Sequence, residues 1–263
     1  MKKFTVITGA TGGLGGAFVS VLAARGENLF LTGRSTDKLL ALKNRLSAEF
    51  PAVQVEIFAA DLTDEKSRAA LIERMQSSDI RIGRLINVAG ADIQKVFTAY
   101  TQEKIAFQCR ANFESAVSLC HAALRNADKG LEILNISSVS GIYPMPYFAI
   151  YSAAKGALAS FSAALREEVK KEGVKVTAVL PGAMPTREDV KEQIKGQGLW
   201  GKLAVKSPAW VAEKSLLAVK KNKRQYIPGF WNQVMNFGTK LLPLSCKLRF
   251  IAKRWSQISK DAF

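Results

Sequence analysis

Tyr151 and Lys155 are the two side chains whose types and spacing most directly suggest chemistry. They lie four residues apart in a segment with helical periodicity, so both project from one face of a helix. Tyrosine titrates at about pH 10 in water, but a neighbouring ammonium group favours the tyrosinate. Such a pair can exchange a proton with a carbonyl or an alcohol. Alone, the pair more often marks an exposed helix face; Ser138, directly after an expected strand and thirteen residues upstream, strengthens the acid/base interpretation.

Glycines cluster directly after the first expected strand, in the run Thr8-Gly9-Ala10-Thr11-Gly12-Gly13-Leu14-Gly15-Gly16. Glycines there permit a tight turn and let backbone N–H groups approach a pyrophosphate at the start of a helix. The spacing fits TGxxxGxG if Gly13 is the middle glycine, and TGxxGxxG if it is Gly12. An ordinary turn is the alternative, but the position in the first strand–helix unit indicates a nucleotide site.

The residues after the second expected strand distinguish between two dinucleotides. An acidic residue there typically binds the ribose hydroxyls of NAD, but the sequence continues Gly33-Arg34-Ser35. The Arg34 guanidinium and the Ser35 hydroxyl suit a 2′-phosphate, so we predict NADP(H), with a simple surface arginine as the alternative. Asp61-Leu62, after the third expected strand, is a candidate adenine contact. Asp61 could instead cap the helix that begins near Asp64.

Short β-branched runs alternate with helical patterns in the first two thirds of the chain. The expected strands are 4–8, 28–32, 53–58, 84–88, 131–136 and 174–180, and the expected helices are near 14–25, 36–49, 64–77, 102–127 and 151–171. A helix near 208–222 and a short strand at 225–227 follow. This alternation predicts an α/β fold with a Rossmann-like, doubly wound parallel sheet, which binds ligands at the carboxyl ends of its strands.

Further motifs complete the pattern: Asn87-Val88-Ala89-Gly90, Asn112 and Pro181-Gly182-Ala183-Met184-Pro185-Thr186. With the glycine turn, Ser138 and the Tyr151–Lys155 pair, they resemble the short-chain dehydrogenase/reductase family over roughly residues 1–187. The match is to the family's shorter, non-extended branch. Val88 stands where the family usually has a second asparagine.

The resemblance implies a role for each matching residue. Tyr151 would protonate a carbonyl oxygen as hydride arrives, Ser138 would hold that oxygen, and Lys155 would bind the nicotinamide ribose. Asn112 would position a water that links Lys155 to solvent. Together with Arg34, Ser35, Asp61 and Leu62, which follow the second and third expected strands, the implied cofactor contacts are Gly9, Thr11, Gly13, Leu14, Gly15, Asn87, Ala89, Gly90, Tyr151, Lys155, Pro181, Gly182 and Thr186.

The segment 141–150 is apolar and aromatic, as is Leu199-Trp200 within an expected substrate loop at about 184–205. Such a lining suits an apolar carbonyl or alcohol, for example a fatty-acyl ketone, a steroid or a small aromatic compound, although these side chains could equally be core. We therefore expect an NADP-dependent oxidoreductase acting on CH–OH groups. The alternative is a non-catalytic NADP-binding sensor or scaffold, against which the intact set Asn112, Ser138, Tyr151 and Lys155 argues.

Composition narrows the class of protein. The 263 residues are 48% hydrophobic and 23% charged, as expected for one globular domain. Three cysteines and one histidine form no ligand pattern, so we expect no metal site and no disulfide framework. The unpaired cysteines and the lack of an export signal predict a cytoplasmic protein. We expect a homodimer or homotetramer.

The net charge of +16 is concentrated at the C-terminal end, where residues 190–263 carry 15 basic and 3 acidic side chains. We divide the chain into a catalytic domain at 1–228 and a basic amphipathic extension at 229–263. Apolar residues of the extension, including Trp231, follow helical spacing that Pro243 interrupts. Two interpretations stay open: peripheral contact with an anionic membrane at its inner surface, or packing on protein. No nucleic-acid partner is expected, because no reading module occurs.

Overall fold

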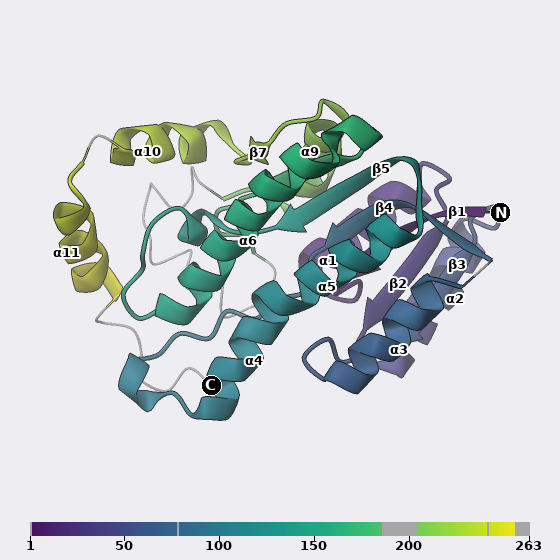
Figure 1. The fold of residues 1–263 in the computed structure, drawn as a ribbon, viewed down its shortest axis with the longest axis horizontal. Helices are drawn as coiled ribbons and strands as arrows, with labels where there is room; N and C mark the ends of the chain where they lie inside the picture. Colours follow the sequence, from purple (N-terminus) through teal and green to yellow (C-terminus); the bar gives the residue numbers. More distant parts are fainter. Residues whose placement is uncertain (1, 78, 186–204, 241, 256–263) are drawn as a thin grey trace.

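The described part of the chain, residues 2–77, 79–185, 205–240 and 242–255 of the computed structural model, is built on a seven-stranded parallel sheet (Figure 1). The strands are β1 (Lys2–Thr8), β2 (Leu29–Gly33), β3 (Val55–Ala59), β4 (Ile80–Asn87), β5 (Ala127–Ile136), β6 (Lys175–Val179) and β7 (Gln225–Tyr226). They lie in the order β3-β2-β1-β4-β5-β6-β7. This confirms the doubly wound parallel sheet, and the order reverses between β1 and β4.

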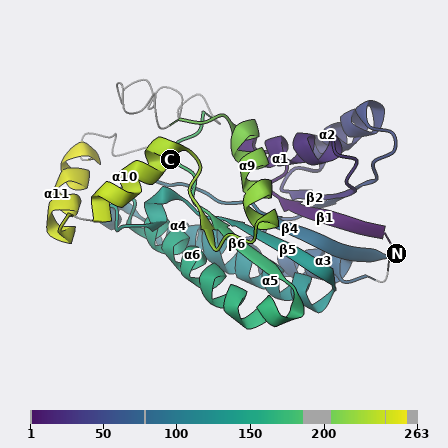
Figure 2. The ribbon, with the colours of Figure 1, turned by 90° about the horizontal axis from the view of Figure 1, so that it is seen from above.

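Helices cover both faces of the sheet (Figure 2). One face carries α1 (Gly13–Ala23), α2 (Thr36–Glu49) and α9 (Pro208–Lys220); the other carries α3 (Glu65–Met75), α4 (Gln102–Cys109), α5 (Ser115–Arg125) and α6 (Ala149–Val169). Local sequence explains several helix starts. Ser35, Asp64 and Ser207 each accept a hydrogen bond from an N–H group in the first turn of α2, α3 and α9.

The core forms two layers, one on each face of the sheet. Leu29 and Leu31 of β2 pack in the layer of α1, α2 and α9, whereas Phe30 packs in the layer of α3, α5 and α6. All three side chains are fully buried. Because successive strand residues point to opposite faces, one continuous apolar run supplies both layers. This two-sided burial fixes the strand ends from which the cavity described below is built.

The helix expected at 102–127 departs from the sequence-based boundaries. It divides into α4 and α5, which are joined by η2, a π-helical turn at Arg110–Glu114. β4 and β5 also begin several residues before the starts expected at 84 and 131. Their first residues include charged side chains such as Arg81 and Lys129. A search for apolar runs therefore places the start of each strand too late.

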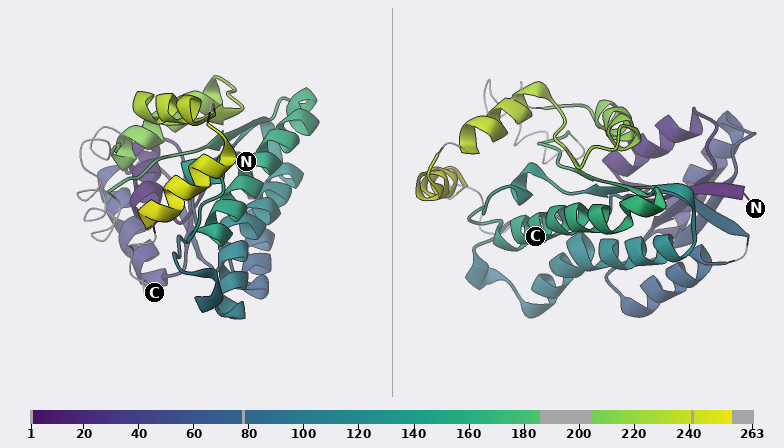
Figure 3. Two further views of the ribbon diagram at one scale, coloured as in Figure 1. Left: turned by 90° about the vertical axis from the view of Figure 1, so that its left-hand side faces the viewer. Right: turned by 45° about the horizontal axis from the view of Figure 1, so that its top comes forward.

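Two helices follow β7 at the C-terminal end (Figure 3). They are α10 (Phe230–Lys240) and α11 (Leu244–Trp255), and Pro243 lies between them, where the sequence predicted a break. None of the described helices is long and apolar enough to span a bilayer. Most of the expected substrate loop, residues 186–204, lies outside the described residues.

Candidate active site

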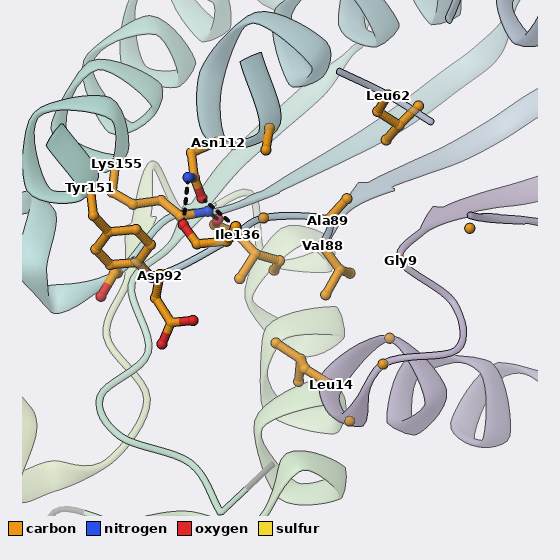
Figure 4. Close-up of a pocket in the computed structure, with 18 of the residues that line it drawn as sticks. Gly9, Leu14, Leu62, Val88, Ala89, Asp92, Asn112, Ile136, Tyr151 and Lys155 are labelled. Carbon is orange, nitrogen blue, oxygen red and sulfur yellow. Dashed lines mark hydrogen bonds between the residues drawn. The ribbon is translucent and has the colours of Figure 1, made fainter. Parts of the chain in front are cut away.

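A cavity of about 450 Å³ lies at the carboxyl ends of the strands, beside the point where the strand order reverses (Figure 4). Loops that follow β1 to β6 all contribute to its wall. The sequence-predicted residues in the wall are Gly9, Thr11, Gly13, Leu14, Gly15, Arg34, Asp61, Leu62, Ala89, Gly90, Asn112, Ser138, Tyr151, Lys155, Pro181 and Gly182.

Glycines shape the turn between β1 and α1. Gly9 has a φ of 63°, a left-handed conformation that favours glycine. A Cβ atom on Gly15 would lie 2.0 Å from the Gly9 carbonyl oxygen, so no larger residue permits this close approach. Gly12 and Gly13 both line the cavity, and the lining is compatible with either spacing of the motif. The first turn of α1 thus borders the cavity, where its N–H groups and dipole favour an anion.

Thr8, the last residue of β1, fastens this turn to β4. Its Oγ1 accepts hydrogen bonds from the backbone N–H groups of Val88 and Ala89, each at 3.0 Å. A Cβ atom on Gly9 would lie only 3.1 Å from the Ala89 Cα atom. The floor of the cavity at the switch point is therefore closely packed backbone.

Arg34 and Asp61 line the end of the cavity beyond β2 and β3. Asp61 accepts hydrogen bonds from the Thr63 backbone at 2.9 Å and from the Thr63 hydroxyl at 2.7 Å. Burial alone would raise the pKa of Asp61, but these bonds and the Arg34 charge hold it below its usual value. Asp64, not Asp61, caps α3, so the Asp61 carboxylate is turned to its own loop and to Arg34.

Lys155 is the buried cation of the site. Its Nζ atom donates a hydrogen bond to the Ile136 carbonyl oxygen at 2.9 Å and lies 5.8 Å from the centre of the Tyr151 ring. Only 4% of the residue is exposed. This burial lowers the pKa of Lys155 to about 8, although the nearby Asp92 carboxylate counteracts part of the effect. Lys155 is thus near its titration point at neutral to mildly alkaline pH.

Asn112 is presented by the π-helical turn η2. Its Nδ2 atom donates to the carbonyl oxygens of Ala91 at 2.7 Å and Gln108 at 3.0 Å, and its Oδ1 atom accepts from the Ala91 N–H group at 3.2 Å. Gly90 lies where Asn112 meets Lys155: a Cβ atom there would be 2.7 Å from Asn112 Oδ1 and 3.1 Å from Lys155 Nζ. The fixed Asn112 amide thus holds the loop after β4 against the buried lysine.

Ser138 and Tyr151, the other two predicted acid/base residues, also line the cavity. Ser138 follows β5; its Oγ accepts from the Ser140 N–H group at 3.1 Å and donates to the Ser140 hydroxyl at 3.0 Å. Tyr151 lies in the first turn of α6, one turn before Lys155, and its ring contacts that of Phe148 at 5.9 Å. A hydroxyl, a phenol and an ammonium group therefore share one end of the cavity, as proton transfer to a carbonyl oxygen requires.

Three predicted residues are not in the described wall. Ser35 caps α2 by accepting a hydrogen bond from the Lys38 N–H group. Asn87 is buried in the sheet, where its Nδ2 atom donates to Asn135 Oδ1 at 2.8 Å, so it bridges β4 to β5. Thr186 lies outside the described residues.

The wall also contains residues that no sequence motif indicated. Thr63, Phe107 and Asp92 are among them, and Asp92 is labelled in Figure 4. Of these residues, Asp92 can influence the chemistry of the site, because its charge raises the pKa of Lys155. A signal was available: Asp92 lies in the loop after β4, which must reach the same sheet edge as the loop carrying Ser138.

The arrangement can be compared with known proteins. The family model described as short chain dehydrogenase matches residues 3–195. The chain is a short-chain dehydrogenase. Among solved structures, this short-chain dehydrogenase is similar to one from Sphingobium yanoikuyae in complex with NADPH, with 31% identity and a TM-score of 0.76. The similarity covers 91% of this chain and 94% of that one.

Two curated relatives of this short-chain dehydrogenase have named substrates. It is 32% identical to the 3-ketodihydrosphingosine reductase of Bacteroides thetaiotaomicron, over 70% of this chain and 65% of the relative. It is 33% identical to the very-long-chain 3-oxoacyl-CoA reductase of Bos taurus, over 71% of this chain and 61% of the relative. The matches thus span slightly less than two thirds of each relative.

Proposed function

We propose that this short-chain dehydrogenase is an NADP(H)-dependent oxidoreductase that interconverts a carbonyl and an alcohol on an apolar substrate. The observation that carries the proposal is that one and the same cavity joins the glycine turn and Arg34 to Ser138, Tyr151 and Lys155. The NADPH complex of the Sphingobium yanoikuyae protein supports the choice of cofactor.

The residues present fit a dinucleotide phosphate. Gly12, Gly13 and Gly15 line the cavity at the start of α1 without side chains, so a pyrophosphate could approach the N–H groups there. Arg34, in the wall after β2, offers a planar cation for a 2′-phosphate. Asp61 and Leu62 would border the adenine, and Pro181 and Gly182 the opposite end.

The chemistry assigned to this chain is proton transfer. When bound, the reduced nicotinamide supplies hydride to the carbonyl carbon. The Tyr151 hydroxyl donates a proton to the carbonyl oxygen, which Ser138 holds by a second hydrogen bond. The Lys155 ammonium stabilises the tyrosinate left behind, with one N–H group fixed by Ile136. The tyrosinate regains its proton from solvent by way of Lys155, which lies beside the backbone that Asn112 holds.

An apolar chain on the ketone is supported by the wall and by the relatives. Val88, Phe107 and Met184 line the cavity, and Phe148 contacts Tyr151. The names of the two curated relatives specify a 3-keto or a 3-oxo group, and one specifies a very long chain. We therefore favour a fatty-acyl ketone over the steroid and small aromatic alternatives.

The test is NADPH oxidation by the full chain against ketones of increasing alkyl length. Activity should rise with chain length, and Tyr151→Phe should reduce it at least about 100-fold while NADPH binding is retained, because general acid catalysis contributes about 10²–10⁴-fold. Tyr226→Phe, on β7 and outside the cavity wall, is the matched control. Turnover by Tyr151→Phe above about a hundredth of the wild-type rate would contradict the assignment. NADPH binding without turnover of any ketone would favour a sensor or scaffold.

Assembly and location complete the proposal. We propose a cytoplasmic homodimer or homotetramer, as expected from the sequence. Analytical ultracentrifugation of the full chain measures the assembly; a single monomeric species at all accessible concentrations would contradict it.

A further inference from the structure

Helix α10 has its polar side toward the protein and its apolar side toward solvent. Asn232 is buried and Asn236 and Thr239 are half-buried, at the i, i+4, i+7 spacing of one helix face. Phe230 and Phe237 on the other side are 69% and 70% exposed. A helix on a globular protein normally shows the opposite arrangement, because burial of its apolar face stabilises it. The outward apolar face therefore indicates a ligand surface.

The polar side of α10 is attached to the rim of the catalytic cavity. A Cβ atom on Gly182, a residue of the cavity wall, would lie 2.9 Å from Asn232 Nδ2, so this amide packs directly on the backbone there. The Thr239 hydroxyl, which donates to the Asn236 carbonyl oxygen at 3.0 Å, faces Tyr143 in the apolar segment 141–150. These contacts fix the orientation of α10.

Helix α11 reaches the same rim by aromatic contact. The Trp255 ring packs edge to face on Phe148, with ring centres 5.1 Å apart, and Phe148 in turn contacts Tyr151. Leu248 and Ile251 are half-buried with Trp255 at helical spacing, whereas Phe250 is 69% exposed. The end of α11 is therefore separated from the proposed catalytic tyrosine by a single aromatic ring.

We call the exposed apolar residues of the two helices and of the link between them the tail surface. It consists of Phe230, Trp231, Val234, Met235, Phe237, Leu242, Leu244 and Phe250, eight of the twelve exposed large hydrophobic residues of the described chain. The segment 230–255 carries five lysines and arginines and no acidic residue. Arg249 and Lys253 are exposed beside Phe250 on α11. Apolar and aromatic side chains are thus combined with positive charge.

We propose that the tail surface docks on an anionic lipid bilayer, from which the cavity receives its long-chain ketone. Exposed aromatics and leucines beside lysines and arginines match the acyl boundary and the negative headgroups of such a surface. The contacts of α10 and α11 would hold the cavity rim at this boundary. This inference names the source of the substrate and rests on the proposed function for that part only.

Charge favours lipid over a second copy of the chain. In a two-fold interface the same patch meets itself, so each basic tail surface would face another. Like charges across an interface oppose association. An anionic bilayer instead attracts each of these side chains through a potential that salt screens.

Co-sedimentation of the full chain with phosphatidylcholine vesicles, with and without phosphatidylglycerol, tests the docking. Binding should require phosphatidylglycerol and weaken when salt is raised severalfold. Lipids with brominated acyl chains should quench tryptophan fluorescence, and Trp231→Phe should lose much of this quenching. No binding by the wild-type chain, or equal binding to both vesicles, would overturn the proposal.

A double variant locates the contact. Phe230→Ser with Phe237→Ser should weaken vesicle binding by about tenfold or more per phenylalanine, from the loss of burial in the acyl boundary. The control is Leu40→Ser with Leu217→Ser, which removes two exposed apolar side chains from α2 and α9. Equal weakening by both pairs would refute a specific surface. A wild-type dimer that this phenylalanine variant converts to monomer, without vesicle binding, would assign the surface to a second copy.

Activity assays keep the two proposals apart. On a water-soluble ketone without vesicles, the phenylalanine variant should retain wild-type turnover. On a long-chain ketone supplied within phosphatidylglycerol vesicles, its rate should fall in proportion to its lost binding. Vesicle binding without reduction of any ketone would refute the proposed function and leave the docking intact. Reduction of ketones without vesicle binding would refute the docking and leave the proposed function intact.

Discussion

Replacing Lys155 with methionine should stabilise the folded chain near pH 7 while abolishing turnover. Burial lowers the pKa of Lys155 from 10.5 to about 8, so its ammonium form is disfavoured in the folded state. At about 1.4 kcal/mol per pH unit, holding that charge costs on the order of 3 kcal/mol of folding free energy. Methionine has a similar length and carries no charge. The substitution removes only the hydrogen bond to the Ile136 carbonyl oxygen, worth about 1.5–3 kcal/mol for a charged donor.

The pH dependence separates the cost of the buried charge from the loss of the hydrogen bond to Ile136. Below pH 8 both folded and unfolded chains carry the Lys155 proton, and the full cost is present. Between about pH 8 and 10.5 the unfolded chain binds more protons, so wild-type stability should rise with pH relative to Lys155→Met. Other titrating groups cancel in this difference.

Urea unfolding of both proteins without cofactor, from pH 7 to pH 10, measures the effect. The free energy of unfolding of the wild type, minus that of Lys155→Met, should increase by about 2–3 kcal/mol over this range. A difference that stays constant with pH would show that Lys155 is not held as a buried, disfavoured ammonium group, and the reasoning would fail.

Three further changes test the remaining parts of the site. Arg34→Ala should weaken NADPH binding by about 10- to 150-fold and leave NADH binding unchanged, measured by nucleotide fluorescence; a wild-type preference for NADH would contradict this role. Gly90→Ala should reduce kcat by about tenfold or more by displacing Lys155 Nζ, whereas Gly238→Ala, with open space around the new Cβ, should not. Asp92→Asn should shift the alkaline limb of the kcat/KM profile to lower pH, because the Asp92 charge raises the pKa of Lys155; an unshifted limb would exclude this coupling.

Sequence patterns predicted the parts of the molecule that follow from periodicity and topology. Tyr151 and Lys155 share a helix face, and the loop carrying Ser138 ends at the same sheet edge, so their meeting follows once the parallel sheet is inferred. Asn87 shows the limit: it lies at the end of β4, but its side chain points to Asn135 inside the sheet. Which way the last residue of a strand points depends on local twist and pairing, which a pattern does not contain.

Long-range packing explains the other gaps. Asp92 lies in an irregular loop without periodicity, so its contact with the catalytic end depends on how Asn112 holds that loop. In α10, the spacing predicts an amphipathic helix but not which face meets the protein. Here the contacts of Asn232 and Thr239 with the cavity rim decide the orientation, and both partners are distant in sequence.

The π-helical turn that carries Asn112 has a consequence for how this helix can change by insertion or deletion. A π turn holds one residue more than the α-helical turn it replaces, and each residue of an α-helix advances the side-chain direction by about 100°. The five residues of the π turn span about the same rotation as four α-helical residues, so deleting one residue from 110–114 would leave a regular helix in which α4 and α5 keep nearly the same relative orientation. The change would cost little in helix propensity, yet the wider turn that presents Asn112 to the loop after β4 would be lost. A one-codon deletion could thus convert this helix from a catalytic support into a purely structural one.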